Sequence, residues 1–538
     1  MKTLIAYLFS SACIFAQTRV SPEKEAALKA DMAGHIDSMK KQAQVMVDSV
    51  FSFAELGFQE FETSKYLSGI LEKEGFKVER NVAGIPTAFL ASWGEGKPVI
   101  ALGSDIDDIP QASQKPGVAY REPLVEGAPG HGEGHNSGMP LQIIAALAAK
   151  RVMEREHLPG TLKVWPGVAE ELVGTKAYYV RAGMFKDVDV CLFAHVGANL
   201  GVGWGPNGGN GLVSVEYLFK GESAHAAGAP WRGKSALDAA ELMSVGYEFR
   251  REHLRLATRV HYVITNGGDQ PNVVPPNAGI WFYFREADYD HIMNLWQIGD
   301  RMAQGATLMT DTTYTSRLLG SAWPGHFNRA IAEDMYENIK KVGLPQWSDD
   351  DQALAKAFQT LMKVPPRGLP TRIAPLRAPR PEPEADSPEA NIGPTGGASD
   401  DIGDISWNVP TVVLGYPSNF QGGPGHNWAN AISMATPVAH KGVIAGAKVQ
   451  AMTILDIVLH PELVQHAWDY FNNVQTKDVK YKSFLRPGDK PPLWLNQKIM
   501  EQYRSAMKPF YYDPLRYDTY LEQLGVKYPT LQPAPGKK

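Results

Sequence analysis

The chain has 538 residues, of which 44% are hydrophobic and 21% charged, and its formal net charge is −5. Single domains usually span about 100–200 residues, so this length predicts at least two compact units. The slightly acidic balance provides no basic surface of the kind that binds nucleic acid, and we therefore expect no nucleic-acid partner.

The first 16 residues have the pattern of a secretory signal peptide. Lys2 gives a charged start, a short and mostly apolar run follows from Thr3 to Phe15, and Ala16 is a small residue suited to cleavage. We therefore expect an exported protein, periplasmic or secreted, that begins at residue 17. Attachment of a lipid to Cys13 is the alternative, although the preceding residues 10–12 lack the usual apolar residue three places upstream.

The sequence offers neither a disulfide to stabilise the mature chain nor a clear membrane-spanning segment to anchor it. Cys13 and Cys191 are the only cysteines, and removal of the signal peptide leaves one, so no intramolecular disulfide can form. Cys191 lies in a largely apolar run, where a buried small side chain is favoured over a nucleophile. After the signal peptide, no stretch approaches the roughly 20 consecutive apolar residues of a membrane-spanning helix, so we expect no membrane span.

Helical and strand patterns alternate along the next part of the chain. Residues 21–74 are mainly helical in pattern, residues 98–103 read as a short buried strand, and a breaker-free helix extends over about 141–156. Strands at 161–165 and 188–194 follow. This alternation predicts a sheet layered with helices, an α/β core whose first part lies at residues 17–211.

The pattern changes at residue 212. Strand 213–219, helix 235–245, strands 260–265 and 280–284, helix 291–303 and strand 312–318 give the order β-α-β-β-α-β. This order is typical of a ferredoxin-like α+β sandwich, so we expect residues 212–325 to form an inserted domain. The core pattern resumes near Asn328 and includes a strand at 410–415 and a long helix from Pro437, which places the second part of the α/β core at 326–460.

Two segments carry weaker signals. Residues 364–389 contain eight prolines interspersed with charges, a composition that favours an extended surface loop over a packed element. The C-terminal extension, residues 461–538, is rich in aromatic residues and proline. We expect it to pack back on the core, but it contains no motif from which a function follows.

Polar side chains follow the apolar strands at the points where these strands end. They are Asp105 and Asp107, Glu170 and Glu171, His195, and His426 in a glycine-rich turn. In open α/β sheets the functional groups gather beyond the carboxyl ends of the strands, so we expect these side chains to converge at one sheet edge.

The segment Gly130–Asn136 adds Glu133 and His135 to this set. A glycine-rich loop of this kind is by itself more often a structural turn, and a single His195 after a strand is more often an ordinary hydrogen-bonded histidine. Together, imidazoles and carboxylates suit zinc or a similar divalent ion. The pair Glu170-Glu171 is either a solvated acidic turn or part of a catalytic site. In a catalytic site, one carboxylate would bind metal and the other would take a proton.

Five sequence blocks occur in a fixed order and together resemble a known family. They are Gly130-His131-Gly132-Glu133-Gly134-His135-Asn136, Ala169-Glu170-Glu171, Ser223-Ala224-His225-Ala226-Ala227, Pro271-Asn272-Val273-Val274-Pro275-Pro276 and Ala398-Ser399-Asp400-Asp401-Ile402-Gly403-Asp404-Ile405-Ser406-Trp407. The chain is similar to the metal-dependent amidohydrolases, in the branch formed by the second of the two aminobenzoyl-glutamate hydrolase subunits. Auxin-conjugate hydrolases and glutamate carboxypeptidase are relatives of this branch. The resemblance covers roughly residues 46–456.

This resemblance implies a zinc-exopeptidase-like catalytic domain of the α/β class, with the inserted ferredoxin-like domain as a lid and dimerisation domain. It also implies a set of site residues. His135, Glu171, His195 and His426 would be metal ligands, and Glu170 the general base. The branch usually has cysteine where this chain has Glu133, so a hard carboxylate would replace a soft thiolate as a ligand. The implied cofactor is zinc or manganese, as one or two ions, and the replacement leaves both identity and number open.

Three further residues are candidates for substrate binding. His225 and Asn272 match positions that relatives use to hold the substrate or its oxyanion, often across a dimer interface, which implies a homodimer formed through the inserted domain. Without the resemblance they would be a histidine in an exposed turn and a turn-capping asparagine. Arg285 ends the strand at 280–284, and its guanidinium could bind a substrate carboxylate in bidentate fashion; otherwise it is a surface arginine.

The sequence therefore predicts a metal-dependent hydrolase that cleaves the amide bond of an N-acyl amino acid, an aminobenzoyl-glutamate-like molecule or a short peptide, with the inserted domain closing over this small substrate as a lid. A dipeptidase or aminoacylase of the same fold is the nearest alternative. A non-catalytic binding protein of that fold is the alternative from another class, and Glu133 is the feature that supports it.

Overall fold

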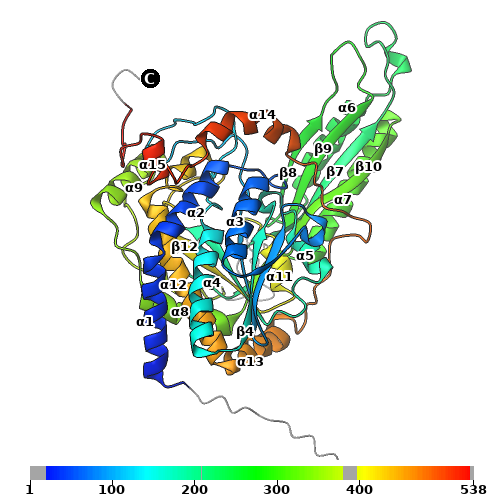
Figure 1. Cartoon of the computed structure of the whole chain (residues 1–538). Helices are drawn as coiled ribbons and strands as arrows, with labels where there is room; N and C mark the ends of the chain where they lie inside the picture. The colour runs from blue at the N-terminus through cyan, green and yellow to red at the C-terminus, as the bar shows by residue number, and fades with distance from the viewer. Residues whose placement is uncertain (1–19, 207–208, 380–396, 534–538) are drawn as a thin grey trace, which may run out of the picture.

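The computed structural model describes residues 20–206, 209–379 and 397–533 (Figure 1). The expected signal peptide, Cys13 and residues 380–389 of the proline-rich segment lie outside the described residues. Helices surround a central sheet in the body of the molecule, and a smaller unit of strands and helices extends from one side of it (Figure 1). Cys191 is buried, in agreement with the sequence.

The central sheet has six strands in the order β1-β2-β4-β3-β5-β12. These strands are β1 (Lys77–Arg80), β2 (Phe89–Glu95), β3 (Val99–Asp105), β4 (Gly160–Gly167), β5 (Val190–Gly197) and β12 (Thr411–Pro417). Strands β3, β4, β5 and β12 run parallel, so their carboxyl ends meet at one edge, as the sequence predicts. Strands β1 and β2 are antiparallel additions that the sequence did not reveal; β1 exposes most of its residues and has no apolar alternation.

The helices of the body include those predicted over residues 21–74, at 141–156, after Asn328 and from Pro437. They are α1 (Pro22–Ser38), α2 (Lys40–Phe53), α3 (Phe61–Lys73), α4 (Gly138–Glu156), α5 (Lys176–Ala182), α8 (Arg329–Val342), α9 (Asp349–Leu361), α11 (Ile402–Ser406) and α12 (Pro437–Leu459). Helix α4 begins three residues before the expected start and is almost entirely buried in its first three turns. Helix α9 and the short helices α5 and α11 were not predicted.

Helix α12 has the length and overall composition of a membrane span, although it lacks a run of about 20 consecutive apolar residues. Among the described residues it is the one helix long and apolar enough to pass that test, with a mean hydropathy of 1.6. Its most apolar window is 89% buried inside the protein, against α4 and β12. The apolar composition therefore serves the core, and the charged residues Lys441, Lys448 and Asp456 interrupt it.

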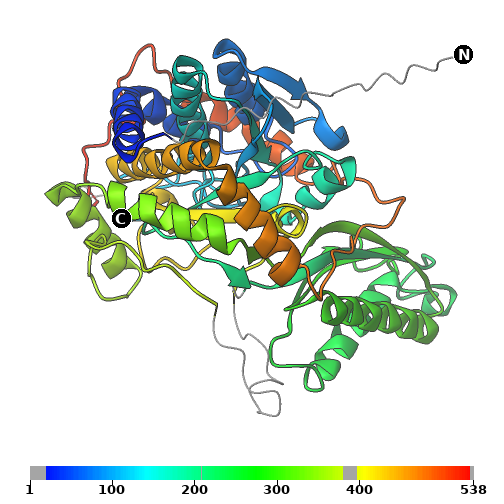
Figure 2. The ribbon, with the colours of Figure 1, turned by 90° about the horizontal axis from the view of Figure 1, so that it is seen from below.

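The inserted unit is the predicted sandwich. Its sheet has the order β10-β7-β9-β8, and its elements follow one another as β7 (Gly211–Lys220), α6 (Ala236–Arg251), β8 (Arg259–Asn266), β9 (Asn277–Glu286), α7 (Tyr289–Thr310) and β10 (Thr313–Ala322). We call this unit the lid. The short antiparallel strands β6 (Gly205–Pro206) and β11 (His326–Phe327) pair where the chain enters and leaves it. The lid projects from the body, with β8 as an exposed edge strand (Figures 1 and 2).

The proline-rich segment and the C-terminal extension both lie against the body. Ala374 N and Arg377 N donate hydrogen bonds to Leu200 O and Val202 O, each at 3.1 Å, so the described part of the segment is an extended loop held along residues 200–204. The extension contains α13 (Pro461–Tyr470), α14 (Gln497–Met507) and α15 (Tyr520–Gln523). Met500 and Met507 of α14 are buried against Leu56, which confirms that the extension packs on the core.

Candidate active site

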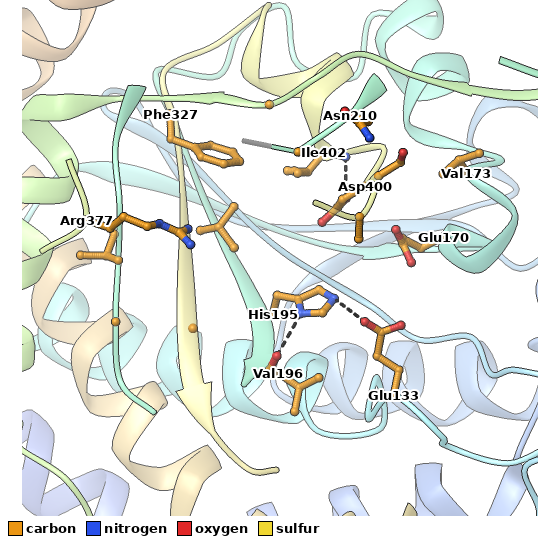
Figure 3. A pocket seen from close by; sticks show the side chains of 18 of the residues that line it. Glu133, Glu170, Val173, His195, Val196, Asn210, Phe327, Arg377, Asp400 and Ile402 are labelled. Carbon is orange, nitrogen blue, oxygen red and sulfur yellow. Dashed lines mark hydrogen bonds and ion pairs between the residues drawn. The ribbon is translucent and has the colours of Figure 1, made fainter. Parts of the chain in front are cut away.

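Imidazole and carboxylate groups from four segments meet at the carboxyl edge of the central sheet. His135 Nε2 lies 3.4 Å from His195 Nε2, and Glu133 Oε1 lies 3.6 Å from the same His195 nitrogen. His426 Nε2 lies 2.8 Å from Glu133 Oε2 and 3.2 Å from Glu171 Oε2. We call these residues, together with Glu170, the carboxylate–imidazole cluster. Figure 3 shows His195 and Glu133 facing each other, with Glu170 on the neighbouring wall.

Two of these segments adopt backbone conformations that few residues tolerate. Gly134 has φ 118° in the loop between Glu133 and His135, and a Cβ there would lie 2.5 Å from Met434 Sδ. Ala169 and Val173 flank the short 3-10 helix η2 (Glu170–Leu172), and both have left-handed φ angles, 51° and 47°. Such angles are unfavourable for a β-branched residue such as Val173, and strained residues are enriched at functional sites.

Asp107 holds this arrangement in place. Its carboxylate oxygens accept hydrogen bonds from Glu170 N and Glu171 N, at 3.0 and 3.1 Å, which fixes the turn that carries both glutamates. Its main-chain oxygen lies 3.2 Å from His135 Nδ1. A hydrogen bond at Nδ1 leaves Nε2 as the atom that faces the cluster, which is the usual arrangement for a metal-binding histidine.

Burial and the concentration of negative charge perturb the proton affinities of the cluster. Burial raises the pKa of Glu170 well above its usual value, and the neighbouring charges of Asp400 and Asp105 add to this increase. Burial, with the charge of Glu133, likewise raises the pKa of Glu171. For His135, burial opposes the charged form, but the hydrogen bond with Asp107 and the nearby carboxylates outweigh it and raise the pKa.

These features fit a divalent cation. Ligand atoms of Glu133, His135, Glu170 and Glu171 all lie within 4.8 Å of one another, as do those of Asp105, His135 and His195. Among the described residues, Asp105 Oδ2 is buried without a hydrogen-bond partner. Buried carboxylates that would otherwise hold protons are stabilised in their ionised form when a cation takes the place of those protons. The mixture of nitrogen and oxygen donors suits zinc or manganese.

A second charged group lies behind the cluster. Lys176, at the start of α5, is fully buried, and its Nζ contacts Asp401 Oδ1 and lies 2.6 Å from Asp105 Oδ1. Asp401 Oδ2 also accepts hydrogen bonds from Thr175 N and Lys176 N. This network ties the block at residues 398–407 to the segment after η2, so it supports the turn that carries Glu170.

A cavity of about 780 Å³ opens in front of the cluster. Glu133, Glu170, Glu171, His195 and His426 line it, and so does Arg285 from the lid strand β9. Arg285 is partly buried, and among the described residues its Nε has no hydrogen-bond partner. Figure 3 shows Arg377 on the wall opposite Glu170, so the proline-rich segment, expected only as a surface loop, contributes to the cavity.

The structure does not place His225 and Asn272 in this cavity. Both are exposed on the lid, where Ala226 N donates to Asn272 O at 3.0 Å and Gly228 N donates to His225 Nδ1 at 3.0 Å. The first bond holds the two segments next to each other, and the second lies within the turn of His225 and engages Nδ1 rather than Nε2 of its ring. Of the nine site residues expected from sequence, seven therefore lie in or beside the cavity of one chain.

Sequence reasoning assigned no role to Asp107, Lys176 or Asp401. Asp107 follows β3 in the motif Asp105-Ile106-Asp107, and this position was the signal that pointed to it. Asp401 belongs to the block at residues 398–407, but nothing in the sequence linked it to Lys176, 225 positions earlier. Only the packing of α5 beside α11 brings the two together.

Comparison with known proteins identifies relatives of the chain. Residues 207–300 match the peptidase dimerisation domain of the M20 family. The chain is 34% identical over 444 residues to the second of the two p-aminobenzoyl-glutamate hydrolase subunits of Escherichia coli strain K12, covering 80% of this chain and 92% of that protein. It is 27% identical over 447 residues to the Xaa-Arg dipeptidase of Mus musculus, covering 81% and 90%. A solved structure from methicillin-resistant Staphylococcus aureus, assigned as an aminohydrolase, shares the fold with a TM-score of 0.54 and 16% identity, covering 80% and 100%.

Proposed function

Because the chain belongs to the M20 family of metal-dependent amidohydrolases and peptidases, in the p-aminobenzoyl-glutamate hydrolase branch, we propose that it hydrolyses the amide bond of an N-acyl amino acid whose carboxylate lies next to that bond. The carboxylate–imidazole cluster beside a cavity that also contains Arg285 is the observation that carries this proposal. A cation-binding hydrolytic centre and a guanidinium in one cavity suit an amide with an adjacent carboxylate.

The cluster would hold the metal through His135, Glu171, His195, His426 and Glu133. Zinc or manganese, as one or two ions, would supply Lewis acidity that lowers the pKa of water and polarises the scissile carbonyl. The carboxylate of Glu133 favours a harder ion than a thiolate would, so manganese is the stronger candidate here.

Glu170 is the residue best placed to move protons. It lies in η2 next to Glu171, faces the cavity, and is oriented by the hydrogen bond from its main-chain N to Asp107. In its ionised form it takes a proton from the attacking water as the new C–O bond forms. It then passes that proton to the amide nitrogen as the C–N bond breaks, so that a carboxylic acid and an amine are released.

We propose further that two copies of the chain form a homodimer through their lids and that His225 and Asn272 of one copy reach the cavity of the other. The match of residues 207–300 to a dimerisation domain supports this, as does the exposure of both residues outside their own cavity. His225 would then donate to the oxyanion, and Asn272 would hold the substrate.

We also propose export, because residues 1–16 have the pattern of a signal peptide. Expression of the full chain, followed by cell fractionation and determination of the N-terminal residue, tests this. A mature protein that starts at residue 17 outside the cytoplasm is expected, whereas a lipid-modified Cys13 would replace simple cleavage, and an intact Met1 in the cytoplasm would refute export.

The direct test of function is a screen of the metal-loaded protein. The apo protein is reconstituted with manganese or zinc and incubated with aminobenzoyl-glutamate, other N-acyl amino acids and dipeptides. Metal-dependent release of the free amino acid from N-acyl substrates is expected. Turnover of dipeptides alone would make this a dipeptidase, as the likeness to the Xaa-Arg dipeptidase allows. Metal binding without turnover of any amide would favour a binding protein.

A further inference from the structure

Lid strand β9 brings a second side chain to the cavity besides Arg285. Tyr283 lines the cavity and lies two positions before Arg285, so the two side chains share one face of the strand. The Arg285 guanidinium lies 5.1 Å from the centre of the Tyr283 ring. Tyr283 pairs in register with Ser214 of β7, and Ser214 Oγ accepts a 2.7 Å hydrogen bond from Trp281 Nε1, which fixes this part of the strand.

The Tyr283 ring is docked against the turn that carries the catalytic glutamates. It packs with Val173, Leu212 and Ala322 in a small apolar group. Val173 follows Glu171 by two residues, and its main-chain oxygen accepts a 3.0 Å hydrogen bond from Ser321 N of β10. Figure 3 shows Val173 and Glu170 on the same side of the cavity. The lid of each chain is thereby attached to its own catalytic turn.

The hydroxyl of Tyr283 remains a hydrogen-bond donor at working pH. Burial raises the pKa of Tyr283, and the negative charges of Glu171 and Glu170 raise it further, while Arg285 and a hydrogen bond with Ser214 oppose this. A neutral phenol offers its proton to an acceptor with growing negative charge. The carboxylates of the cluster cannot do so in their ionised form.

An amide hydrolase needs such a donor. When water attacks, the carbonyl π electrons move to oxygen, and a donor aimed at that oxygen stabilises the transition state more than the ground state. His225, the donor proposed above, lies outside the cavity of its own chain. Tyr283 is a neutral donor that lines this cavity and packs beside the glutamate turn, and Asn199, Asn210 and Ser399 line the cavity as well.

We propose that the Tyr283 hydroxyl donates a hydrogen bond to the scissile carbonyl oxygen of a substrate in the same chain's cavity, while Arg285, two residues further along β9, binds the substrate carboxylate. This rests on the proposed amide hydrolysis and adds a catalytic residue to it. The proton of Tyr283 stays on its oxygen throughout, and the proton that reaches the leaving nitrogen comes from water through Glu170.

The test compares Tyr283→Phe with Tyr262→Phe in the metal-loaded enzyme. Tyr262 lies on β8, its ring packs 5.0 Å from Phe282, and it does not line the cavity, so its loss controls for removal of a lid hydroxyl. We expect Tyr283→Phe to lower kcat by about 100-fold, the usual effect of losing one oxyanion donor, with KM within about threefold. Tyr262→Phe should retain kcat within about twofold of the wild type.

A second measurement separates transition-state from ground-state binding. A phosphonamidate analogue of the substrate imitates the tetrahedral oxyanion, and Tyr283→Phe should weaken its binding by the same factor as kcat. An unchanged kcat, or a raised KM with normal kcat and unchanged analogue binding, would overturn the proposal. So would loss of bound metal in Tyr283→Phe, because Tyr283 would then be structural.

Failure of the Tyr283 assignment can be distinguished from failure of the proposed amide hydrolysis. If the wild-type enzyme with manganese or zinc releases no amino acid from any N-acyl substrate, the function itself is wrong. If the wild type is active and Tyr283→Phe is equally active, only the assignment of Tyr283 is wrong.

Discussion

His426 Nε2 lies 2.8 Å from Glu133 Oε2 although 293 positions separate the two residues in the chain. The other oxygen of the same carboxylate lies 3.6 Å from His195 Nε2. Glu133 therefore lies between two histidines, with one carboxylate oxygen towards each of them. Burial raises the pKa of Glu133, but the hydrogen bond with His426 and the charges of His135 and His195 outweigh it and lower the pKa, so this carboxylate is ionised and ready to bind a cation.

Replacement of Glu133 by cysteine is expected to shift metal preference towards zinc. A thiolate is a softer ligand than a carboxylate and binds zinc more tightly relative to manganese. After equilibration with equal concentrations of both ions, mass spectrometry of Glu133→Cys should show a zinc-to-manganese ratio roughly tenfold or more above that of the wild type. Glu126→Cys, at an exposed position in the preceding segment, is the matched control. An unchanged ratio in Glu133→Cys would mean that Glu133 does not bind the metal.

Replacement of Glu170 by glutamine should remove the general base and leave metal binding largely intact. We expect kcat to fall by about 10²–10⁴-fold, because the amide cannot take or deliver the proton. The experiment measures kcat together with metal content, and Glu154→Gln on the exposed face of α4 serves as a control. Near-normal turnover by Glu170→Gln would show that another group is the base.

Mixed dimers should reveal which residues act within one chain and which act across the interface. His225→Ala and Glu170→Gln are each expected to be inactive, but equal amounts, unfolded and refolded together, should regain about a quarter of wild-type activity, since half of the dimers would contain one intact site out of two. Tyr283→Phe mixed with Glu170→Gln should regain no activity beyond that of the two variants alone, because both changes would affect groups that serve the same chain's site.

The opposite pattern would contradict these assignments. Absence of recovery with His225→Ala would mean that His225 does not act across the interface. Recovery with Tyr283→Phe would mean that Tyr283 serves the other chain's site. Size-exclusion chromatography of each mixture confirms that dimers are present before activity is compared.

Glu25 should stabilise the fold above pH 4.5 and lose that effect in acid. Burial raises its pKa, but hydrogen bonds with Lys29 and His460, at 2.9 and 3.0 Å, outweigh this and lower the pKa from 4.5 to about 2. A folded-state pKa below the unfolded value means that the stabilisation is complete above pH 4.5 and disappears as pH falls towards 2.

The variant Glu25→Gln tests this linkage. We expect it to lower the free energy of unfolding at pH 7 by less than about 1 kcal/mol, since the side chain is partly solvated. Urea denaturation of both proteins between pH 7 and pH 3 should show the difference shrinking with acidification. A difference that is constant with pH would show that the ionised carboxylate is not its source.

Elements with long apolar periodicity were predictable from sequence. The parallel strands β3, β4, β5 and β12 agree with the prediction because most of their residues form a buried apolar face. The order of the lid elements agrees as well, although the edge strand β8 is largely exposed. Strand β1 is short and exposed and therefore has no such face. Helix α9 was missed although Ser348 and Asp351 form a capping box at its start, which was a usable local signal.

The amino-acid sequence by itself determined which types of side chain form the site and after which strands they lie. Glu170, Glu171 and His195 follow their strands as local sequence features, and the parallel order of a sheet then places them on one edge. Only the tertiary structure decided which of these atoms come within a few ångströms. The contact of Lys176 with Asp401, the docking of Tyr283 beside Val173 and the separation of His225 from its own cavity depend on packing between distant segments, which no local pattern encodes.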